Sequence, residues 1–220
     1  QYDQFVLKIV PHYRQMIDAL TACLPFHSSQ TLQFLDLGSG TGMVTSQLKK
    51  NFPRSNITCV DISSNMINIA RQRFDGQGTI EFIEADYCGM SFESERYDAV
   101  VSSLAMHHIR SAEDKQKLFQ NIFSSLRPRG LFVNADVILG SSRLLHQAYM
   151  EKWKAFMREA VSEQEINEKW LPRYYETDHP FELMKELEWL KKAGFQDIDV
   201  AWKHYTVAVY VGFKGGEREL

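Results

Sequence analysis

The sequence predicts a single α/β domain built on a mostly parallel β-sheet. Between residues 31 and 130, short β-rich runs alternate with amphipathic stretches, which is the pattern of βαβ units. A glycine-rich loop at residues 38–42 separates the first of these runs from the first amphipathic stretch. The chain has 220 residues, of which 44% are hydrophobic, so it can bury one full core.

Five strands are predicted in the alternating region and two more near the C-terminus. The predicted strands comprise residues 32–37, 57–61, 80–86, 97–103, 131–136, 195–200 and 205–213. The fourth strand is almost wholly apolar after its acidic start, as expected for a strand that is covered on both faces. Only residues 201–204 connect the last two strands, which favours an antiparallel final strand.

The predicted helices lie between these strands and cover both faces of the sheet. They run from the glycine loop through Lys50, from Ser63 or Ser64 through Phe74, from Ala112 to Leu126 and from Pro180 to Ala193. Ser63 or Ser64 can cap the second helix. The third ends at Arg127 to Gly130, because proline and glycine together stop a helix, and Gly194 closes the fourth.

A polar helical segment interrupts the alternation after the fifth strand, from Ser141 to about Arg173. Apolar residues recur in it at steps of about four, and they are Leu145, Tyr149, Trp153, Phe156 and Ala160. Ligands of open α/β sheets bind beyond the carboxyl ends of the strands, so this cap is placed to roof a ligand pocket. A helix that only buttresses the sheet edge is the alternative.

Composition and charge exclude several classes of protein. Lys and Arg number 25 against 28 Asp and Glu, a net charge of −3, so there is no global basic field for nucleic acid or an anionic membrane. Three widely spaced cysteines, Cys23, Cys59 and Cys88, fit neither a disulfide framework nor a paired-cysteine zinc site, and they predict a reducing compartment. The sequence shows neither a membrane-spanning run nor a signal-peptide pattern, so we expect a cytoplasmic protein.

The glycine loop is typical of two folds that bind nucleosides, the dinucleotide fold and the S-adenosyl-methionine fold. The dinucleotide fingerprint requires Gly or Ala three residues after its second glycine, where this chain has Met43. Asp36, just before the loop, would repel a pyrophosphate but suits a ligand with an ammonium group. Asp61, at the end of the second strand, is placed to accept hydrogen bonds from both ribose hydroxyls. The pattern therefore favours S-adenosyl-methionine.

The chain resembles the class I S-adenosyl-methionine-dependent methyltransferases over most of its length. The similar segments are residues 35–42 for the first motif of that family, 60–63 for the second, 84–86 for the third, 97–108 for the fourth and 126–131 before the fifth strand. The resemblance implies a Rossmann-like fold with a seven-stranded sheet and a cap inserted after the fifth strand. It also implies a methyltransferase whose cofactor is S-adenosyl-L-methionine.

The resemblance further implies which residues bind the cofactor. They are Tyr13, Asp36, Gly38, Ser39, Gly40, Asp61, Ile62, Met66, Ala85, Asp86, Tyr87, Ser103 and Leu104. The glycines and the Ser103 to Leu104 pair are expected beside the methionine part. Ile62 and Met66 are expected to enclose the adenine, and Asp86 with Tyr87 to meet its edge. A core role for Met66 and a turn-forming role for Asp86 are the alternatives.

The candidate catalytic residues are Tyr13, His107 and Asp136. Methyl transfer from a sulfonium mainly requires alignment, and it needs a base only when the acceptor must lose a proton early. Tyr13 lies in a segment that forms either a lid over the cofactor or a surface helix. His107 and His108 are adjacent on a predicted helix start, so their side chains should diverge by about a hundred degrees, and no metal site is expected.

We therefore expect a single methyltransferase domain over residues 1–220. Its parts are an N-terminal helical lid at 1–30, a cofactor-binding core at 31–140, a helical cap at 141–179, and the last helix and C-terminal strands at 180–220. The expected acceptor is a small molecule, and neither nucleic acid nor a membrane is an expected partner. The acceptor atom and the oligomeric state, with a homodimer as one option, stay open.

Two further functions stay open beside this one. The segments 11–13, 162–166 and 192–195 are also similar to carboxy-S-adenosyl-methionine synthases, which use the same scaffold for a modified cofactor. In those enzymes an arginine soon after the Glu-Ile pair is expected to bind the extra carboxylate. Trp170 occupies that position here, with Arg173 nearby, so an ordinary small-molecule methyltransferase is favoured. A regulatory module that binds the cofactor without catalysis is the other alternative.

Overall fold

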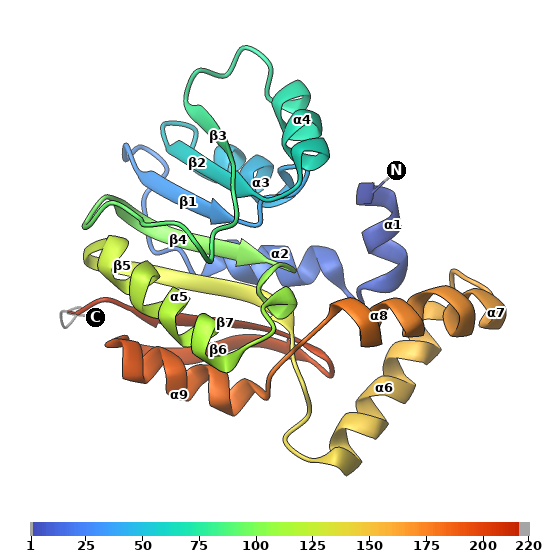
Figure 1. The fold of residues 1–220 in the computed structure, drawn as a ribbon. Coiled ribbons are helices and arrows are strands. Elements are labelled where there is room, and N and C mark those ends of the chain that lie inside the picture. Colours follow the sequence, from blue (N-terminus) through green and yellow to red (C-terminus); the bar gives the residue numbers. More distant parts are fainter. Residues whose placement is uncertain (1, 216–220) are drawn as a thin grey trace.

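The computed structural model describes residues 2–215, which form a seven-stranded sheet flanked by helices (Figure 1). The strands are β1 Gln33–Leu37, β2 Asn56–Asp61, β3 Ile80–Glu84, β4 Tyr97–Ser103, β5 Leu126–Val137, β6 Gln196–His204 and β7 Val207–Phe213. Their order is β3-β2-β1-β4-β5-β7-β6, with β1 to β5 parallel to one another and β7 antiparallel to both β5 and β6. The predicted seven-stranded, mostly parallel sheet is confirmed.

The helices connect the strands and extend the chain at its N-terminus and after β5. They are α1 Tyr2–Ile9, α2 Tyr13–Ala22, α3 Met43–Asn51, α4 Ser64–Arg73, η1 Met106–His108, α5 Ala112–Ser125, α6 Arg143–Met157, α7 Glu163–Glu165, η2 Ile166–Trp170, α8 Leu171–Thr177 and α9 Leu183–Ala193. Ser63 caps α4, as predicted, by accepting a hydrogen bond from the Met66 N–H. No helix among the described residues is both long and apolar enough to cross a membrane.

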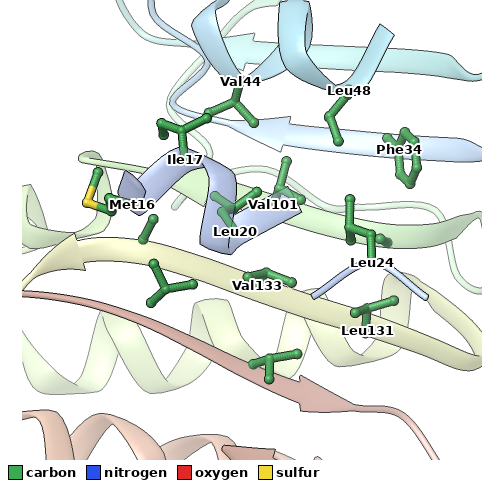
Figure 2. Close-up of a cluster of buried hydrophobic side chains, with 14 of the residues drawn as sticks. Met16, Ile17, Leu20, Leu24, Phe34, Val44, Leu48, Val101, Leu131 and Val133 are labelled. Carbon is green, nitrogen blue, oxygen red and sulfur yellow. The ribbon is translucent and has the colours of Figure 1, made fainter. Parts of the chain in front are cut away.

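Alternate residues of each strand face opposite sides of the sheet and build two core clusters. On one side α2 and α3 pack against residues such as Val101 and Val133 (Figure 2). On the other side α5 and α9 pack against Val100 and Phe132. Both faces of the central strands are therefore buried from solvent, which explains why β4 is almost wholly apolar.

Helix α2 belongs to the core, so the alternative of a surface helix is wrong for its segment. Met16 and Leu20 have no exposed surface and lie against the sheet. Tyr13, at the start of α2, exposes 7% of its surface. Of the predicted N-terminal lid, only α1 lies off the sheet face, beside α6 and α8 (Figure 1).

Three predicted boundaries are wrong near the sheet. Helix α9 begins at Leu183 and not at Pro180, because residues 181–182 are extended and form a bridge to Leu139. Residues 201–204 are not a connection but the end of β6, paired to β7 from Trp202 onward, and the turn is Tyr205–Thr206. Strand β5 begins at Leu126, directly after α5, and its register shifts across the predicted turn at 127–130.

The apolar stripe predicted for the cap is only partly correct, because Tyr149, Trp153 and Phe156 are half-buried while its two ends are not. Leu145 and Ala160 are exposed, and the fully buried positions of α6 are Met150 and Met157. The difference arises because α6 packs on two partners. It contacts α1 and η2, in a cluster that contains Met157 and Trp170, and through Tyr149 it contacts Lys203 and Tyr205 at the end of the edge strand β6.

Candidate active site

A cavity of about 250 Å³ lies at the carboxyl ends of β1, β2 and β4. The predicted residues that line it are Tyr13, Gly38, Ser39, Gly40, Asp61, Ile62, Met66, Tyr87, Ser103 and Leu104. They come from α2, the glycine loop, the end of β2, α4 and the segments after β3 and β4. The fold thus brings most of the predicted cofactor residues to one place.

The glycine loop bends sharply and leaves space on its cavity side. Gly38 and Gly40 have φ angles of 67° and 54°, which side chains rarely tolerate. A Cβ at Gly38 would lie 2.2 Å from that of Ala105, whereas a Cβ at Gly40 would meet no atom within 4 Å. Gly38 is therefore required by packing, and Gly40 leaves an open approach for a ligand.

Asp61 is held rigidly at the edge of this cavity. Its Oδ2 accepts a hydrogen bond from the Gly40 N–H at 2.7 Å, and its Oδ1 accepts one from the Ser63 N–H at 2.8 Å. A carboxylate has about four acceptor positions, so both oxygens can still accept from a ligand. The next residue, Ile62, exposes 67% of its surface, which is unusual for a large apolar side chain beside a cavity.

Asp36, Ala85 and Asp86, the other predicted cofactor residues, do not line the cavity. Asp36 is fully buried behind the loop, where its Oδ2 accepts a hydrogen bond from the Thr45 hydroxyl at 2.6 Å. Burial, assisted by the nearby Asp61 charge and opposed by the Thr45 hydrogen bond, raises the pKa of Asp36 to about 7. Asp86 is exposed, and its Oδ1 accepts from the Cys88 N–H, which is the turn-forming role.

A second cavity, of about 310 Å³, adjoins the first. Residues shared by the two linings are Val6, Met66, Leu104, His108 and Arg173. Leu104, at the junction, has a φ of 52°, and its N–H donates to the Ala135 carbonyl. A left-handed conformation at a non-glycine residue is strained, and such strain concentrates at functional sites.

The second cavity is walled mainly by apolar and aromatic side chains of α1 and the cap. Trp170 is 3% exposed, and its ring centroid lies 4.3 Å from that of Phe5. Trp153 Nε1 donates to the Ile9 carbonyl at 2.7 Å, which ties α6 to α1. Met150 and Tyr174 complete the inner wall.

Helix α1 is also attached to the first cavity. Asp3 accepts a hydrogen bond from the Thr41 hydroxyl at 2.6 Å and forms a salt bridge with Arg73. Because Thr41 belongs to the glycine loop and Arg73 to α4, these contacts fix α1, whose Val6 lines both cavities, beside the loop.

Of the three catalytic candidates, His107 lines the second cavity, Tyr13 lines the first, and Asp136 lies behind His107. His107 Nδ1 is 2.5 Å from Asp136 Oδ1, and both side chains are buried. Burial alone would lower the pKa of His107, but the charge and hydrogen bond of Asp136, with Asp178 nearby, raise it overall. The pair is arranged so that Nε2 is the free nitrogen of His107.

The expectation that His107 and His108 diverge is wrong. Both lie on a 3-10 turn, their ring centroids are 4.1 Å apart, and each ring faces Asp178. The Asp178 Oδ1 atom is 3.7 Å from His107 Nε2 and 3.6 Å from His108 Nδ1. Sequence analysis missed both Asp178 and the placement of Arg173 between the cavities, because no motif links the end of the cap to the segment after β4.

Residues 34–130 match a family model described as a methyltransferase domain. These residues form a domain of the class I S-adenosyl-methionine-dependent methyltransferases. The protein is therefore a methyltransferase, and its cofactor is S-adenosyl-L-methionine, as the resemblance implied. The match covers most of the segments that build the first cavity, but not those that carry Val6, Tyr13 and Arg173, and it ends before the cap.

Comparison with individual proteins agrees with this family. The methyltransferase is 25% identical to the carboxy-S-adenosyl-L-methionine synthase of Nautilia profundicola over 215 residues, which cover 97% of this chain and 90% of that protein. It is 30% identical to the malonyl-[acyl-carrier protein] O-methyltransferase of Bacillus cereus over 175 residues, covering 78% and 61%.

A solved structure shares the fold. Phosphoethanolamine N-methyltransferase 2 of Haemonchus contortus, solved in complex with S-adenosyl-L-methionine, superposes with a TM-score of 0.65 at 24% identity. The alignment covers 86% of this chain but only 38% of that longer protein, so it supports the architecture and not a particular acceptor.

Proposed function

We propose that this methyltransferase transfers a methyl group to a small, partly apolar acceptor that binds in the second cavity. The observation that carries the proposal is the continuity of the two cavities at Met66, Leu104 and Arg173. A cofactor in the first cavity and an acceptor in the second would meet at this junction. Alignment of donor and acceptor is the main catalytic requirement of this reaction.

The residues of the first cavity fit the cofactor. Asp61 would accept hydrogen bonds from the ribose hydroxyls, and the exposed Ile62 with Met66 would cover the adenine. Ser103 Oγ is buried and has no hydrogen-bond partner among the described residues, so it is available to a polar group of the methionine part. When bound, S-adenosyl-methionine supplies the methyl group from a positively charged sulfonium.

The second cavity fits a partly apolar acceptor. Trp153, Trp170 and Tyr174 would contact its apolar part, and the cap with α1 would exclude water from the junction. Among the described residues that line this cavity, Arg173 is the one lysine or arginine. It forms no salt bridge within the part of the chain that the structure describes. Its guanidinium would suit an acceptor that carries a carboxylate or phosphate.

A protic acceptor would lose its proton in this cavity. His107 Nε2 faces it, and Asp136 orients the imidazole from the other side, as in other histidine bases. Tyr13 lines the cofactor side only, so it is the weaker candidate for proton transfer.

Calorimetric titration followed by a methyl-transfer assay tests this function. The methyltransferase should bind S-adenosyl-homocysteine with saturation and should not bind NAD. Labelled S-adenosyl-methionine should then transfer its methyl group to members of a panel of small phenols, thiols and amines, with and without carboxylates. Binding of NAD, or no binding of S-adenosyl-homocysteine, would overturn the assignment of the first cavity. Binding without any transfer would favour the regulatory module.

A carboxy-S-adenosyl-methionine synthase activity is the second candidate. It is favoured by Arg173, which lines both cavities and could reach a carboxylate on the cofactor, and by the similarity to the Nautilia enzyme along the chain. Trp170, at the position expected for arginine, is buried and donates from Nε1 to Glu165. Mass spectrometry of the ligand that co-purifies with the enzyme decides between the two, since a carboxylated cofactor would support the second.

A further inference from the structure

We propose that His107, His108 and Asp178 bind a divalent transition-metal ion, of the class of Zn²⁺ or Co²⁺, on the wall of the acceptor cavity. The metal-binding part stands on the geometry of these residues alone. Its consequence for catalysis rests on the proposed function.

The donor atoms are close enough to share one ion. A ligand atom from each of the three side chains lies within 4.8 Å of the others. In particular, Asp178 Oδ1 is 3.7 Å from His107 Nε2 and 3.6 Å from His108 Nδ1. Bonds of about 2.0–2.2 Å to a tetrahedral ion place ligand atoms about 3.3 Å apart, so small side-chain movements would complete the site.

The donor types also suit such an ion. Two imidazoles and one carboxylate are ligands that zinc, cobalt and iron accept, whereas magnesium and calcium prefer oxygen. Several first-row transition metals compete for sites of this kind. The donor atoms therefore indicate the class of ion, and a binding measurement must identify which ion it is.

His107 is already oriented as a metal ligand. Its Nδ1 is held by Asp136, which fixes Nε2 toward Asp178, and histidine ligands in proteins usually have their second nitrogen held by a carboxylate or carbonyl. The His179 N–H donates to the His107 carbonyl at 2.6 Å, so the segment that carries Asp178 is fixed beside η1.

His108 can adapt to the ion. Its side chain is 50% exposed, and its Nδ1 lies 3.1 Å from the Thr177 carbonyl. Nδ1 can bind the ion if it gives up its proton and this hydrogen bond, and a rotation of the exposed ring would present Nε2 instead. His108 therefore offers either of two nitrogen atoms to the ion. The less exposed His107 and Asp178 would set the position of that ion.

The charges at this wall favour a cation. Asp136 and Asp178 bring two carboxylates beside the two imidazoles, in a cavity whose other walls are mainly apolar. Arg173 also lines the cavity, and Lys115 acts on His107 from behind, but Lys115 is already paired with Glu186. A divalent ion with two neutral histidines would balance the two carboxylates.

The consequence concerns the acceptor atom. Three protein ligands would leave a fourth position open, and all three of these residues line the acceptor cavity, so an acceptor could reach the ion there. A hydroxyl or thiol that coordinates there would lose its proton to solvent, because the ion lowers its pKa. Its oxygen or sulfur would form the bond to the methyl carbon, and the carbon–sulfur bond of the sulfonium would break with its electron pair on sulfur. The metal would then replace His107 as the means of deprotonation.

Titration of the chelator-treated protein with Co²⁺, followed by visible absorption, tests the site. We expect one ion per chain with the strong bands of a four-coordinate centre, and displacement by Zn²⁺. Asp178→Asn and His108→Gln should each weaken binding by at least about 10- to 100-fold, which is the loss found when only an outer-shell partner of a ligand is removed. The matched control is His146→Gln, which changes a histidine of α6 that lines neither cavity.

Two outcomes would overturn the proposal: no saturable binding, or equal affinity in the wild type, both variants and the control, which means adventitious binding only. Circular dichroism establishes that each variant folds. Titration of Asp178→Asn with S-adenosyl-homocysteine separates this proposal from the proposed function. Retained cofactor binding with lost Co²⁺ binding supports the metal site, and retained Co²⁺ binding refutes the role of Asp178 even if methyl transfer is found.

Discussion

Asp36 should make the stability of this protein fall as the pH rises through neutrality. Its carboxyl is fully buried behind the glycine loop, and only one of its two oxygens has a hydrogen-bond partner among the described residues. Burial, opposed by the Thr45 hydrogen bond and assisted by the Asp61 charge, raises the pKa from 3.8 to about 7. The folded state therefore holds a proton that the unfolded chain releases above about pH 4.

The sign and size follow from this difference. A raised folded-state pKa means that the folded state binds more protons between about pH 4 and pH 7, so the free energy of unfolding decreases across that interval. The full shift corresponds to about 4 kcal/mol, and the part that falls between about pH 5.5 and about pH 8.5 is about 2 kcal/mol. Above the folded pKa, the buried charge costs its full amount.

Asp36→Asn removes this titration. The amide oxygen can still accept the Thr45 hydrogen bond, while the amide nitrogen lacks a partner, at a cost of about 1–3 kcal/mol that does not depend on pH. We expect the stability of the variant relative to wild type to improve by about 2 kcal/mol between about pH 5.5 and about pH 8.5. Asp18→Asn, at an exposed position of α2, is the matched control and should show no such change.

Urea unfolding at the two pH values measures these differences directly. Wild type and Asp36→Asn curves that shift in parallel with pH would refute the reasoning, since they would mean that the buried carboxyl does not titrate between folded and unfolded states. A variant that loses relative stability at high pH would refute even the sign.

Three further predictions address the cofactor site and the core. Asp61→Ala should weaken binding of S-adenosyl-homocysteine by about 2–3 kcal/mol in calorimetry, because the ribose hydroxyls lose a charged acceptor, and an unchanged dissociation constant would exclude Asp61 as their partner. Gly38→Ala should lower the melting temperature more than Gly40→Ala, because a Cβ at Gly38 would lie 2.2 Å from that of Ala105. Gly40→Ala should instead weaken cofactor binding more. Equal effects of the two variants would contradict the packing argument. Lys115→Met should destabilise the fold by about 3–5 kcal/mol in urea, because Glu186 would stay buried without its ion-pair partner, and adding Glu186→Leu should recover most of the loss; a single-variant change under about 1 kcal/mol would count against this.

The sheet and the first cavity were predictable because their signals are local. Alternating strands and helices predict the first five strands and their parallel arrangement, and the end of each strand predicts where Asp61 and Ser103 lie. The glycine loop adds a backbone requirement that only glycine meets at Gly38. Each of these inferences needs a few neighbouring residues and one general rule of α/β folds.

The second cavity was not predictable in this way because its contacts join distant segments. The path of the cap sets the approach of Asp178 to His107 and His108, and it depends on how α6 and η2 pack against α1. A periodic stripe predicts that a helix has an apolar side but not its partner, so Met150 was overlooked and Leu145 was overestimated. The sequence analysis inferred a negative charge on Asp36 from its position beside the glycine loop. Burial of the side chain raises its pKa, however, and this decides its protonation state.

The two cavities differ in how the chain builds them, and this separates donor chemistry from acceptor choice. The first is built mainly from residues 38–105, which lie inside the stretch shared with the family model. Most of the second comes from residues 5–11 and from 137 onward, outside that stretch. If the acceptor binds in the second cavity, as proposed, substitutions in α1 and the cap should change the acceptor while the methyl donor stays the same. Chimeras that keep residues 31–140 and replace these two outer segments together are the natural route to new acceptors on this scaffold.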